Sequence, residues 1–328
     1  MKNTVILLAS TLFAQSAMAD IMVYSGRSKS LVQPIIKNFE VETGIKVNVK
    51  YGKSAQLALT LVQEGKKSPA DIFWAQDAGA LGSVSAAGLF TVLPKDITKQ
   101  VPQKLQNNKQ QWVPVTGRAR VLAYKADFPK DKLPKSIFDL TKPEWKGKVG
   151  WAPTNGSFQA FVSAMRVEHG DDKTLAWLKG MKDNKAVVYP KNTPIIQALS
   201  DSKSPISVGL PNHYYLLRFK KSNSKFPVEQ TFFGKGDIGN LVNIAGAGIL
   251  KTSKQSAEAK KFINYLLSSK AQQYFTSDVF EYPMNANVIP NTKLVDQKEL
   301  ISSAPSVDLN KLSDLQGTRE LLKKAGLL

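Results

Sequence analysis

A complete β–α–β pattern runs through residues 21–51, whose sequence is IMVYSGRSKSLVQPIIKNFEVETGIKVNVKY. Its apolar start predicts a strand, and the Ser-Gly-Arg-Ser that follows predicts a turn. Leu31, Ile35 and Phe39 then recur at every fourth position, which predicts one face of an amphipathic helix. The alternating residues at the end of the stretch predict a second strand. A chain that begins in this way is predicted to have an α/β architecture.

The same order of strand, turn and helix returns three more times along the chain. Apolar runs at residues 71–74, 148–152 and 206–210 predict strands, and each is followed by a short turn before a helical stretch. In open α/β sheets, ligands bind beyond the carboxyl ends of the strands, where helix N-termini direct free N–H groups outward. We therefore expect one ligand cleft to gather four turns, which are residues 26–28, 75–77, 154–157 and 212–215.

The N-terminus has the features of an export signal. Lys2 supplies a positive charge, residues 5–14 form a short apolar run, and residues 17–19, Ala-Met-Ala, form a small-residue cleavage site. The apolar run is too short for a transmembrane helix. We expect residues 1–19 to be a signal peptide, the mature chain to begin at Asp20, and the protein to reside in the periplasm.

The composition argues against several classes of site and partner. The chain has no cysteine, so disulfides, thiolate metal sites and a lipoprotein anchor are not expected, and two histidines are too few for an imidazole-rich zinc or copper site. The 45 Lys and Arg residues against 26 Asp and Glu give a formal net charge of +19. The lysines are scattered, without a dense basic run, which favours a solvated surface over a surface that binds nucleic acid. We therefore expect no nucleic-acid partner.

Tyr214 and Tyr215 are the candidate metal ligands. Neighbouring residues in a regular helix point about 100° apart, so two adjacent phenols reach one ion only where the backbone is irregular, as at a strand-to-helix turn. Two phenolate oxygens are hard anionic ligands that suit a hard trivalent cation, and a bound cation would favour their deprotonation. The pattern alone leaves open a second interpretation, in which the two rings pack into the core at the start of a helix.

Three further groups of residues are candidates for binding an anion. Residues 155–157, Asn-Gly-Ser, predict an anion cradle, because Asn caps the next helix, Gly allows close approach and Ser adds a hydroxyl; a plain helix cap is the alternative. Arg118 and Arg120 could hold an anion, bridge two lobes or form exposed ion pairs. Asn192 begins another helical stretch and could add an amide donor, or serve only as part of a turn.

The sequence contains no recognisable catalytic set. It lacks a Ser-His-Asp order, a glycine-rich nucleotide loop and a His-Glu-x-x-His pattern. One histidine, His213, lies beside the tyrosines, but a single imidazole is not a catalytic set. We therefore expect a binding protein and not an enzyme.

The chain resembles the periplasmic ferric-iron-binding proteins of bacterial ABC transporters, also called bacterial transferrins, over essentially the whole mature sequence. Its early motifs are shared with proteins that bind thiamine, phosphonates or polyamines, whereas the tandem tyrosine is specific to the ferric-binding family. The resemblance therefore favours the ligand interpretation of the tyrosine pair. The motifs that carry it are Val23-Tyr24-Ser25-Gly26-Arg27, Glu42-Thr43-Gly44-Ile45-Lys46-Val47, Ser68-Pro69-Ala70-Asp71-Ile72-Phe73, Thr116-Gly117-Arg118-Ala119-Arg120-Val121, Asn212-His213-Tyr214-Tyr215 and Tyr282-Pro283-Met284-Asn285.

The resemblance implies a two-lobed periplasmic-binding-protein (Venus flytrap) fold. Each lobe would be a mixed sheet flanked by helices, with the ligand cleft between the lobes and crossing segments near residues 120–124 and 232–240. The protein would be a monomer that docks on the permease and ATPase of an iron-uptake transporter. The implied division is lobe I over residues 20–117 plus about 238–295, and lobe II over about 118–237 plus 296–328.

The resemblance also implies a ligand set. Fe(III) would be the cargo, held by Tyr214 and Tyr215 together with a synergistic carbonate or phosphate, and Asp77 and Gln76 would be further candidates for the metal. The implied anion site comprises Asn155, Gly156, Ser157, Asn192 and Asn212, with Arg27, Ser28 and Arg118 as additional candidates.

The sequence departs from the best-known members of that family at several ligand positions. Ser28 stands where they place a histidine ligand, and Gln76 where they place a glutamate ligand. Lys29 stands where another branch brings a tyrosine, and Trp151 lies near the region from which others bring a third tyrosine. Only the two tyrosines are matched, so bound anions, water or Asp77 would fill the remaining positions. A protein of the same fold that binds an organic anion or a phosphonate is the alternative.

Overall fold

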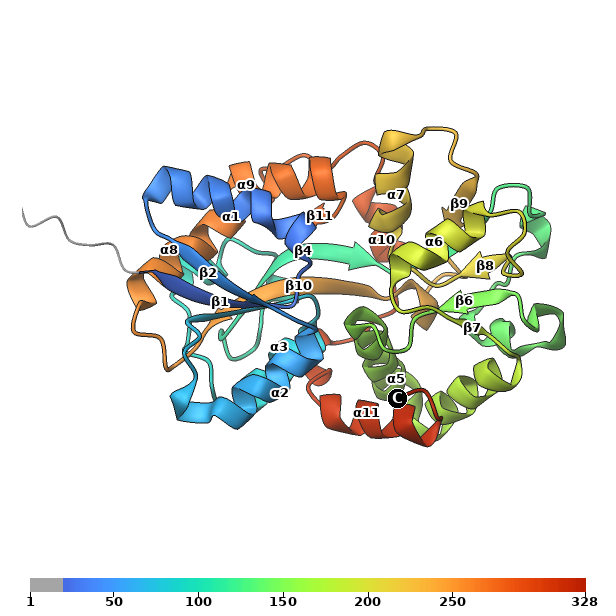
Figure 1. Cartoon of the computed structure of the whole chain (residues 1–328), viewed down its shortest axis with the longest axis horizontal. Helices are drawn as coiled ribbons and strands as arrows, with labels where there is room; N and C mark the ends of the chain where they lie inside the picture. The colour runs from blue at the N-terminus through green and yellow to red at the C-terminus, as the bar shows by residue number, and fades with distance from the viewer. Residues whose placement is uncertain (1–19) are drawn as a thin grey trace, which may run out of the picture.

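The computed structural model describes residues 20–328, so the expected signal peptide lies outside the described residues. The chain forms two β-sheets, each flanked by helices, which lie next to one another along the long axis of the molecule (Figure 1). None of the helices in residues 20–328 has the length and apolar character that crossing a bilayer demands.

The first sheet has six strands, which are β1 (Ile21–Ser25), β2 (Val47–Tyr51), β3 (Ile72–Ala75), β4 (Val113–Ala119), β10 (Val242–Ile249) and β11 (Tyr282–Pro283). Their spatial order is β11-β4-β10-β3-β1-β2. Strand β1 runs parallel to β2 and β3, whereas β10 is antiparallel to β3 and β4, and β11 is antiparallel to β4. The sheet is therefore mixed, with a parallel half that begins the chain.

The second sheet has five strands, which are β5 (Leu122–Lys125), β6 (Val149–Trp151), β7 (Val187–Val188), β8 (Val208–Gly209) and β9 (Val228–Thr231). Their spatial order is β7-β6-β8-β5-β9. Strand β6 is parallel to β7 and β8, and β5 is antiparallel to β8 and β9. This sheet is also mixed.

Helices cover both faces of the first sheet (Figure 1). Because side chains alternate along a strand, Ile72 and Trp74 of β3 pack on one face and Phe73 and Ala75 on the other. The helices of this part are α1 (Lys29–Thr43), α8 (Ser256–Leu267) and α9 (Ser269–Tyr274) on the first face, α2 (Ser54–Glu64) and α3 (Ala78–Ala86) on the second, and the short α4 (Lys95–Thr98).

The first helix follows the sequence prediction closely. Leu31, Ile35 and Phe39 are all buried, as their four-residue spacing predicts. The helix ends at Gly44, which has the left-handed φ of 73° and donates its N–H to the carbonyl of Glu40.

The remaining helices surround the second sheet and form the C-terminus. They are α5 (Gly156–Asp183), α6 (Asn192–Ser200), α7 (His213–Ser222), α10 (Gln297–Ser303) and α11 (Leu315–Lys324). Helix α11 packs along α5, whereas the turn Leu309–Lys311 before it contacts α3 of the first part. Helices α3 and α5 also share one apolar cluster, which includes Leu81 and Phe161. The C-terminal segment therefore touches both halves of the molecule.

Two segments carry the chain between the sheets. The first runs from β4 to β5 through Arg120 and Val121, and the second runs from β9 to β10 over residues 232–241. The two segments are joined, because the N–H of Arg120 donates to the carbonyl of Leu241 at 2.9 Å. A side chain in the second segment, Asn240, is buried and donates to the carbonyls of Phe233 and Ser303.

Candidate functional site

Six strand-to-helix turns lie at the carboxyl ends of parallel strands. In the first sheet three of them lead from β1 to α1, β2 to α2 and β3 to α3, and in the second sheet three lead from β6 to α5, β7 to α6 and β8 to α7. A Cβ atom placed on Gly156 at the start of α5 would lie only 2.7 Å from Nε2 of Gln76 and 3.5 Å from Oδ2 of Asp77. The carboxyl edges of the two sheets therefore face one another, and glycine allows their close approach.

The tyrosine pair occupies the first turn of α7. The rings of Tyr214 and Tyr215 stack with their centroids 4.1 Å apart and an angle of 29° between their planes. Tyr214 is buried and Tyr215 is partly buried. The two rings therefore lie side by side in the first turn of the helix that follows β8.

The environment of Tyr214 disfavours ionisation of its phenol when no cation is bound. Burial raises the pKa of Tyr214 well above its usual value, and the neighbouring phenol of Tyr215 adds to this effect. The positive charge of Arg27 acts in the opposite sense. A cation that binds at these oxygens would have to supply the missing charge stabilisation.

Arg27 is bound to a residue that the sequence analysis did not select. Its NH2 group donates to Oε1 of Glu281 at 2.6 Å, and both side chains are almost fully buried. The second oxygen, Oε2, accepts a hydrogen bond from Oγ1 of Thr116 at 2.5 Å. An acidic residue inside the apolar run from Val279 to Tyr282 was the available signal, because a carboxylate in such a run is seldom buried without a partner.

Arg118 and Arg120 are both buried, at 1% and 2% exposure, which excludes exposed ion pairs among the three alternatives for these residues. Arg120 bridges two parts of the second half, because its guanidinium donates to the carbonyls of Leu210 at 2.6 Å and Ser157 at 2.8 Å. Burial lowers its pKa to about 9, and the charge of Arg118 adds to this. The guanidinium of Arg118 reaches the carbonyl of Ile244 at 3.5 Å, and its buried Nε has no hydrogen-bond partner among the described residues.

The Asn-Gly-Ser turn forms a helix cap, as predicted. Oδ1 of Asn155 accepts hydrogen bonds from the N–H and the hydroxyl of Ser157, at 3.0 and 2.6 Å. The side chain of Asn212 donates to the same hydroxyl at 3.2 Å. The turn before α5 and the turn before α7 are therefore directly connected, and three of the anion candidates lie together.

The other anion candidates differ in their exposure. Asn192 begins α6 and is 1% exposed, and its Nδ2 has no hydrogen-bond partner within residues 20–328. Ser28 precedes α1 and is exposed, with no hydrogen bond from its side chain to the helix. Trp151 is fully buried and packs edge-on against Phe158 and Trp177.

Asp77 caps α3, since its Oδ1 accepts the N–H of Ala80 at 2.8 Å. Burial raises the pKa of this carboxyl to about 6, although the hydrogen bond from Ala80 and the charge of Arg118 oppose the rise. The N–H of Gln76 is bound to the hydroxyl of Ser54 at 2.9 Å. Both side chains thus face the turn before α5, and Asp77 already serves as a cap.

His213 is a structural residue of the site. Its Nδ1 accepts the N–H of Ala119 at 3.1 Å, and its Nε2 contacts the carbonyl of Phe280 at 2.8 Å. Burial lowers the pKa of His213 to about 4. The neutral imidazole therefore ties the tyrosine turn to the first sheet, and it is not exposed to a ligand.

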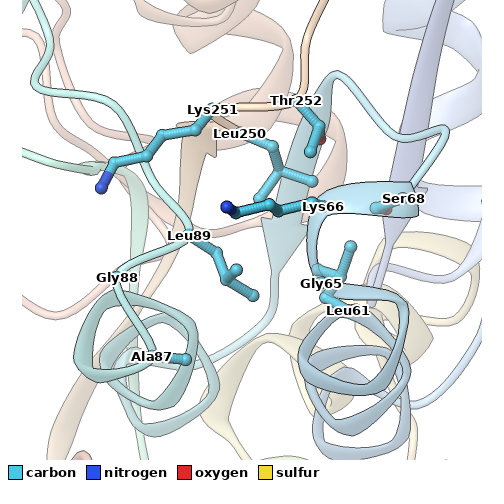
Figure 2. Close-up of a pocket in the computed structure, with 10 residues that line it drawn as sticks. All are labelled: Leu61, Gly65, Lys66, Ser68, Ala87, Gly88, Leu89, Leu250, Lys251 and Thr252. Atoms are coloured by element: carbon cyan, nitrogen blue, oxygen red, sulfur yellow. The ribbon is translucent and has the colours of Figure 1, made fainter.

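A separate cavity of about 540 Å³ contains none of the candidate residues (Figure 2). It has an apolar side formed by Leu61, Leu89 and Leu250. Lys66 and Lys251 also line it, and the amine of Lys66 lies between the lining residues (Figure 2). Because Ser68 precedes β3 and Leu250 follows β10, this cavity lies at the edge of the first sheet opposite to the tyrosine site. Within residues 20–328, no group of three or more His, Cys, Asp and Glu side chains is arranged to hold a metal ion.

Three comparisons with known proteins cover nearly the whole chain. The family model described as bacterial extracellular solute-binding protein matches residues 34–302. An Fe(3+)-binding periplasmic protein of Serratia marcescens is 35% identical over 99% of this chain and 97% of its own length. The major ferric iron-binding protein of Neisseria meningitidis serogroup B is 36% identical over 98% of this chain and 97% of its own length.

Among solved structures, iron-bound HitA from Pseudomonas aeruginosa has a TM-score of 0.88 and 30% sequence identity, and the match covers 94% of this chain and 100% of that chain. The predicted two-lobed α/β architecture, with a mixed sheet in each lobe, is confirmed by this similarity and by the two sheets described above.

Proposed function

The chain belongs to the bacterial extracellular solute-binding protein family, and we propose that it binds ferric iron between its two lobes through the phenolate oxygens of Tyr214 and Tyr215. It acts as a periplasmic monomer without enzymatic turnover, and it delivers iron to the permease and ATPase of an inner-membrane ABC transporter. The lobes that close on the ion are residues 20–117 with about 238–295, and about 118–237 with 296–328.

The observation that carries this proposal is the stacked tyrosine pair. Two phenols whose rings lie 4.1 Å apart present two hard oxygen donors from one helical turn. The turn lies at the carboxyl edge of the second sheet, and Arg27 of the first sheet acts electrostatically on both phenols. An ion held there would contact both lobes, which is how a ligand favours a closed state over an open one.

Carbonate or phosphate is the synergistic anion in this proposal. Nε of Arg118 and Nδ2 of Asn192 are buried donors that lack partners in the described part of the chain, and a bound anion would provide the acceptors that they need. The turn before α5 would contribute the Gly156 backbone and the Ser157 hydroxyl. The proposed anion site is completed by Ser28, Asn212, Arg27 and Asn155. Asp77 or Gln76 would reach the metal.

Iron release follows from the same chemistry. A phenolate must lose its proton to bind the ion, so acid favours release, and displacement of the anion removes ligands from the remaining coordination positions. Burial of Tyr214 favours release in acid further, because it raises the pKa of the phenol and so favours the neutral form when no cation is bound.

The test is a visible absorption titration of the mature protein with ferric citrate, with and without bicarbonate. Ferric phenolate complexes absorb visible light through ligand-to-metal charge transfer. We expect a band that saturates at a single iron per chain, that depends on the anion, and that is lost in Tyr214→Phe and Tyr215→Phe. Tyr124→Phe is the matched control, because Tyr124 is a buried tyrosine of the same half that belongs to β5. Iron retention equal to wild type in both site variants would contradict the proposal.

A second candidate function is the binding of an organic anion or a phosphonate. The unpartnered nitrogen atoms of Arg118 and Asn192 favour it, since they suit an anion with or without a metal. This function predicts that the anion alone raises the melting temperature and that iron adds nothing. A charge-transfer band in the titration would exclude it as the main function.

A further inference from the structure

We infer that Arg27 and Glu281 form a buried, charge-balanced pair beside the tyrosine site, in which Glu281 is a positioning residue that holds the guanidinium of Arg27 next to the two phenols. The inference rests on the proposed ferric function and identifies residues that tune the same site. Arg27 lies in the turn after β1, and Glu281 lies immediately before β11.

The burial of this pair needs an explanation beyond stability. The side chains of Arg27 and Glu281 are 1% and 0% exposed, and the N–O distance is 2.6 Å. Two charges taken out of water lose hydration that their mutual attraction often fails to recover, so a buried ion pair is weak evidence for stabilisation. Each of the other ion pairs between described residues has at least one side chain that is more than a third exposed.

The carboxylate of Glu281 is held from several directions. The hydroxyl of Thr116 in β4 donates to Oε2 of Glu281 at 2.5 Å. The backbone N–H of Glu281 donates to the carbonyl of Phe275 at 3.1 Å. The preceding residue, Phe280, has a left-handed backbone with φ of 62° and ψ of 37°, which a bulky residue seldom adopts. Such a conformation persists only where the surrounding contacts enforce it.

One of those contacts leads directly to the tyrosines. The carbonyl of Phe280 lies 2.8 Å from Nε2 of His213, the residue before Tyr214. The segment that carries Glu281 is therefore attached to the tyrosine turn through Phe280 and to Arg27 through its carboxylate. This double attachment fixes the position of Arg27 relative to both phenols.

The two charges act on Tyr214 in opposite senses. Arg27 is positive and Glu281 is negative, and the contact of the neighbouring Phe280 with His213 brings this pair to the residue before Tyr214. Burial would also raise the pKa of Glu281, but Arg27 and Arg118 hold it below its usual value, so the carboxylate is ionised. The pair thus places a positive and a negative charge beside the same phenol, and their effects partly cancel.

Removing one member at a time should therefore move the electronic energy of the phenolates in opposite directions. In Glu281→Gln, Arg27 remains as an uncompensated positive charge, which stabilises the phenolate electrons and shifts the charge-transfer band to shorter wavelength. In Arg27→Gln, the carboxylate remains beside Arg118 and shifts the band to longer wavelength. The double variant Arg27→Gln/Glu281→Gln should return the band close to the wild-type wavelength.

The experiment records visible spectra of the iron-loaded variants at about pH 8, where carboxylates are ionised. Glu229→Gln is the matched control, because Glu229 pairs with Lys220 of α7 and its loss removes an ion pair from the same helix. The control should leave the band unmoved. Arg27→Lys keeps the charge, so it should retain the wild-type wavelength while Arg27→Gln does not. If Glu281→Gln does not fold, the comparison of Arg27→Lys with Arg27→Gln still shows whether the charge at position 27 sets the wavelength of the band.

Shifts in the same direction for both single variants, or no shift in either folded variant, would overturn the inference while leaving the proposed function intact. A wild-type protein with no charge-transfer band would instead contradict the proposed function, and the inference that depends on it. The two failures are therefore distinguishable in one series of spectra.

Discussion

Nε2 of His213 lies 2.8 Å from the carbonyl oxygen of Phe280, and this contact joins the tyrosine-bearing helix α7 to the first sheet. The other ring nitrogen accepts the N–H of Ala119 at 3.1 Å, so the buried imidazole is neutral, with its proton on Nε2. The geometry of the tyrosine site therefore depends on a histidine that does not itself face the site.

The first prediction concerns acid stability. Burial lowers the pKa of His213 from 6.5 to about 4. Because the folded pKa lies below the unfolded one, the folded state loses stability as the pH falls through about 6.5 towards 4, and this contribution amounts to about 3 kcal/mol. We expect His213→Gln to lack this loss. Urea unfolding of the iron-free protein at several pH values in this range measures it.

His169→Gln is the control for that series, because His169 is the second histidine of the chain and is partly exposed. It should retain the acid-side loss of the wild type. Parallel pH profiles for His213→Gln and the wild type would show that the imidazole is not held neutral by the fold.

The second prediction is that Asp77→Asn stabilises the iron-free protein at high pH. Burial raises the pKa of Asp77 from 3.8 to about 6, so the folded state disfavours the carboxylate above that pH. Asn can still cap α3. We expect Asp77→Asn to be more stable than the wild type by about 3 kcal/mol at about pH 8, and the difference should vanish as the pH falls through 6 towards 4. Chemical unfolding measures both values.

The effects of Asp77 and His213 on stability oppose each other across the same pH range, so the variants and not the wild type reveal them. Asp96→Asn, which changes an exposed aspartate in α4, is the control and should have little effect at any pH. If the difference in unfolding free energy between Asp77→Asn and wild type stays constant with pH, the raised pKa of Asp77 is not its cause.

A third prediction concerns the turn after β1. A Cβ atom on Gly26 would lie 2.0 Å from Oγ and 2.9 Å from Cβ of Ser54. We expect Gly26→Ala to destabilise the protein by about 1–3 kcal/mol or more through overpacking. Adding Ser54→Gly should recover part of this loss, although it also removes the hydrogen bond to the N–H of Gln76. Thermal unfolding of the two single variants and the double variant gives the coupling energy. Strictly additive effects would mean that the two residues do not collide.

The fourth prediction separates the packing role of Tyr214 from its proposed ligand role. The ring is buried against Tyr215, so Tyr214→Ala should cost about 3–5 kcal/mol of stability, whereas Tyr214→Phe should cost about 1 kcal/mol or less. Unfolding of the iron-free protein by urea tests this. A large loss in Tyr214→Phe would indicate that the hydroxyl has a structural partner, and it would weaken the interpretation of lost iron binding in that variant.

The parts of the site that the sequence predicted are local. The Asn155 cap and the placement of the tyrosines at a strand-to-helix turn follow from residues that are neighbours in the chain. Caps, turns and periodic faces depend on backbone geometry over a few residues, so a local pattern is sufficient to predict them. Tyr214 is buried, as the packing interpretation of the tyrosines expects, and its ring also stacks on Tyr215, so burial alone does not decide between packing and ligand roles.

The long-range partners could not be predicted in this way. Arg27 and Glu281 are 254 residues apart, and no local pattern in the sequence connects them. From the sequence, Arg118 and Arg120 could each bind an anion, bridge the lobes or form exposed ion pairs. The structure distinguishes them, because Arg120 donates to two carbonyls, whereas Nε of Arg118 has no hydrogen-bond partner among the described residues.

The sequence by itself determined the strands that precede the candidate turns and the turn that carries Tyr214 and Tyr215, because these depend on hydrophobic periodicity and on capping residues close by in the chain. Only the tertiary structure decided which turns meet, that Gly156 faces Gln76, and that a buried Glu281 holds Arg27 beside the phenols. The physical reason is that such contacts arise when two sheet edges and the segments crossing between them pack together, and a one-dimensional pattern does not contain that distance information.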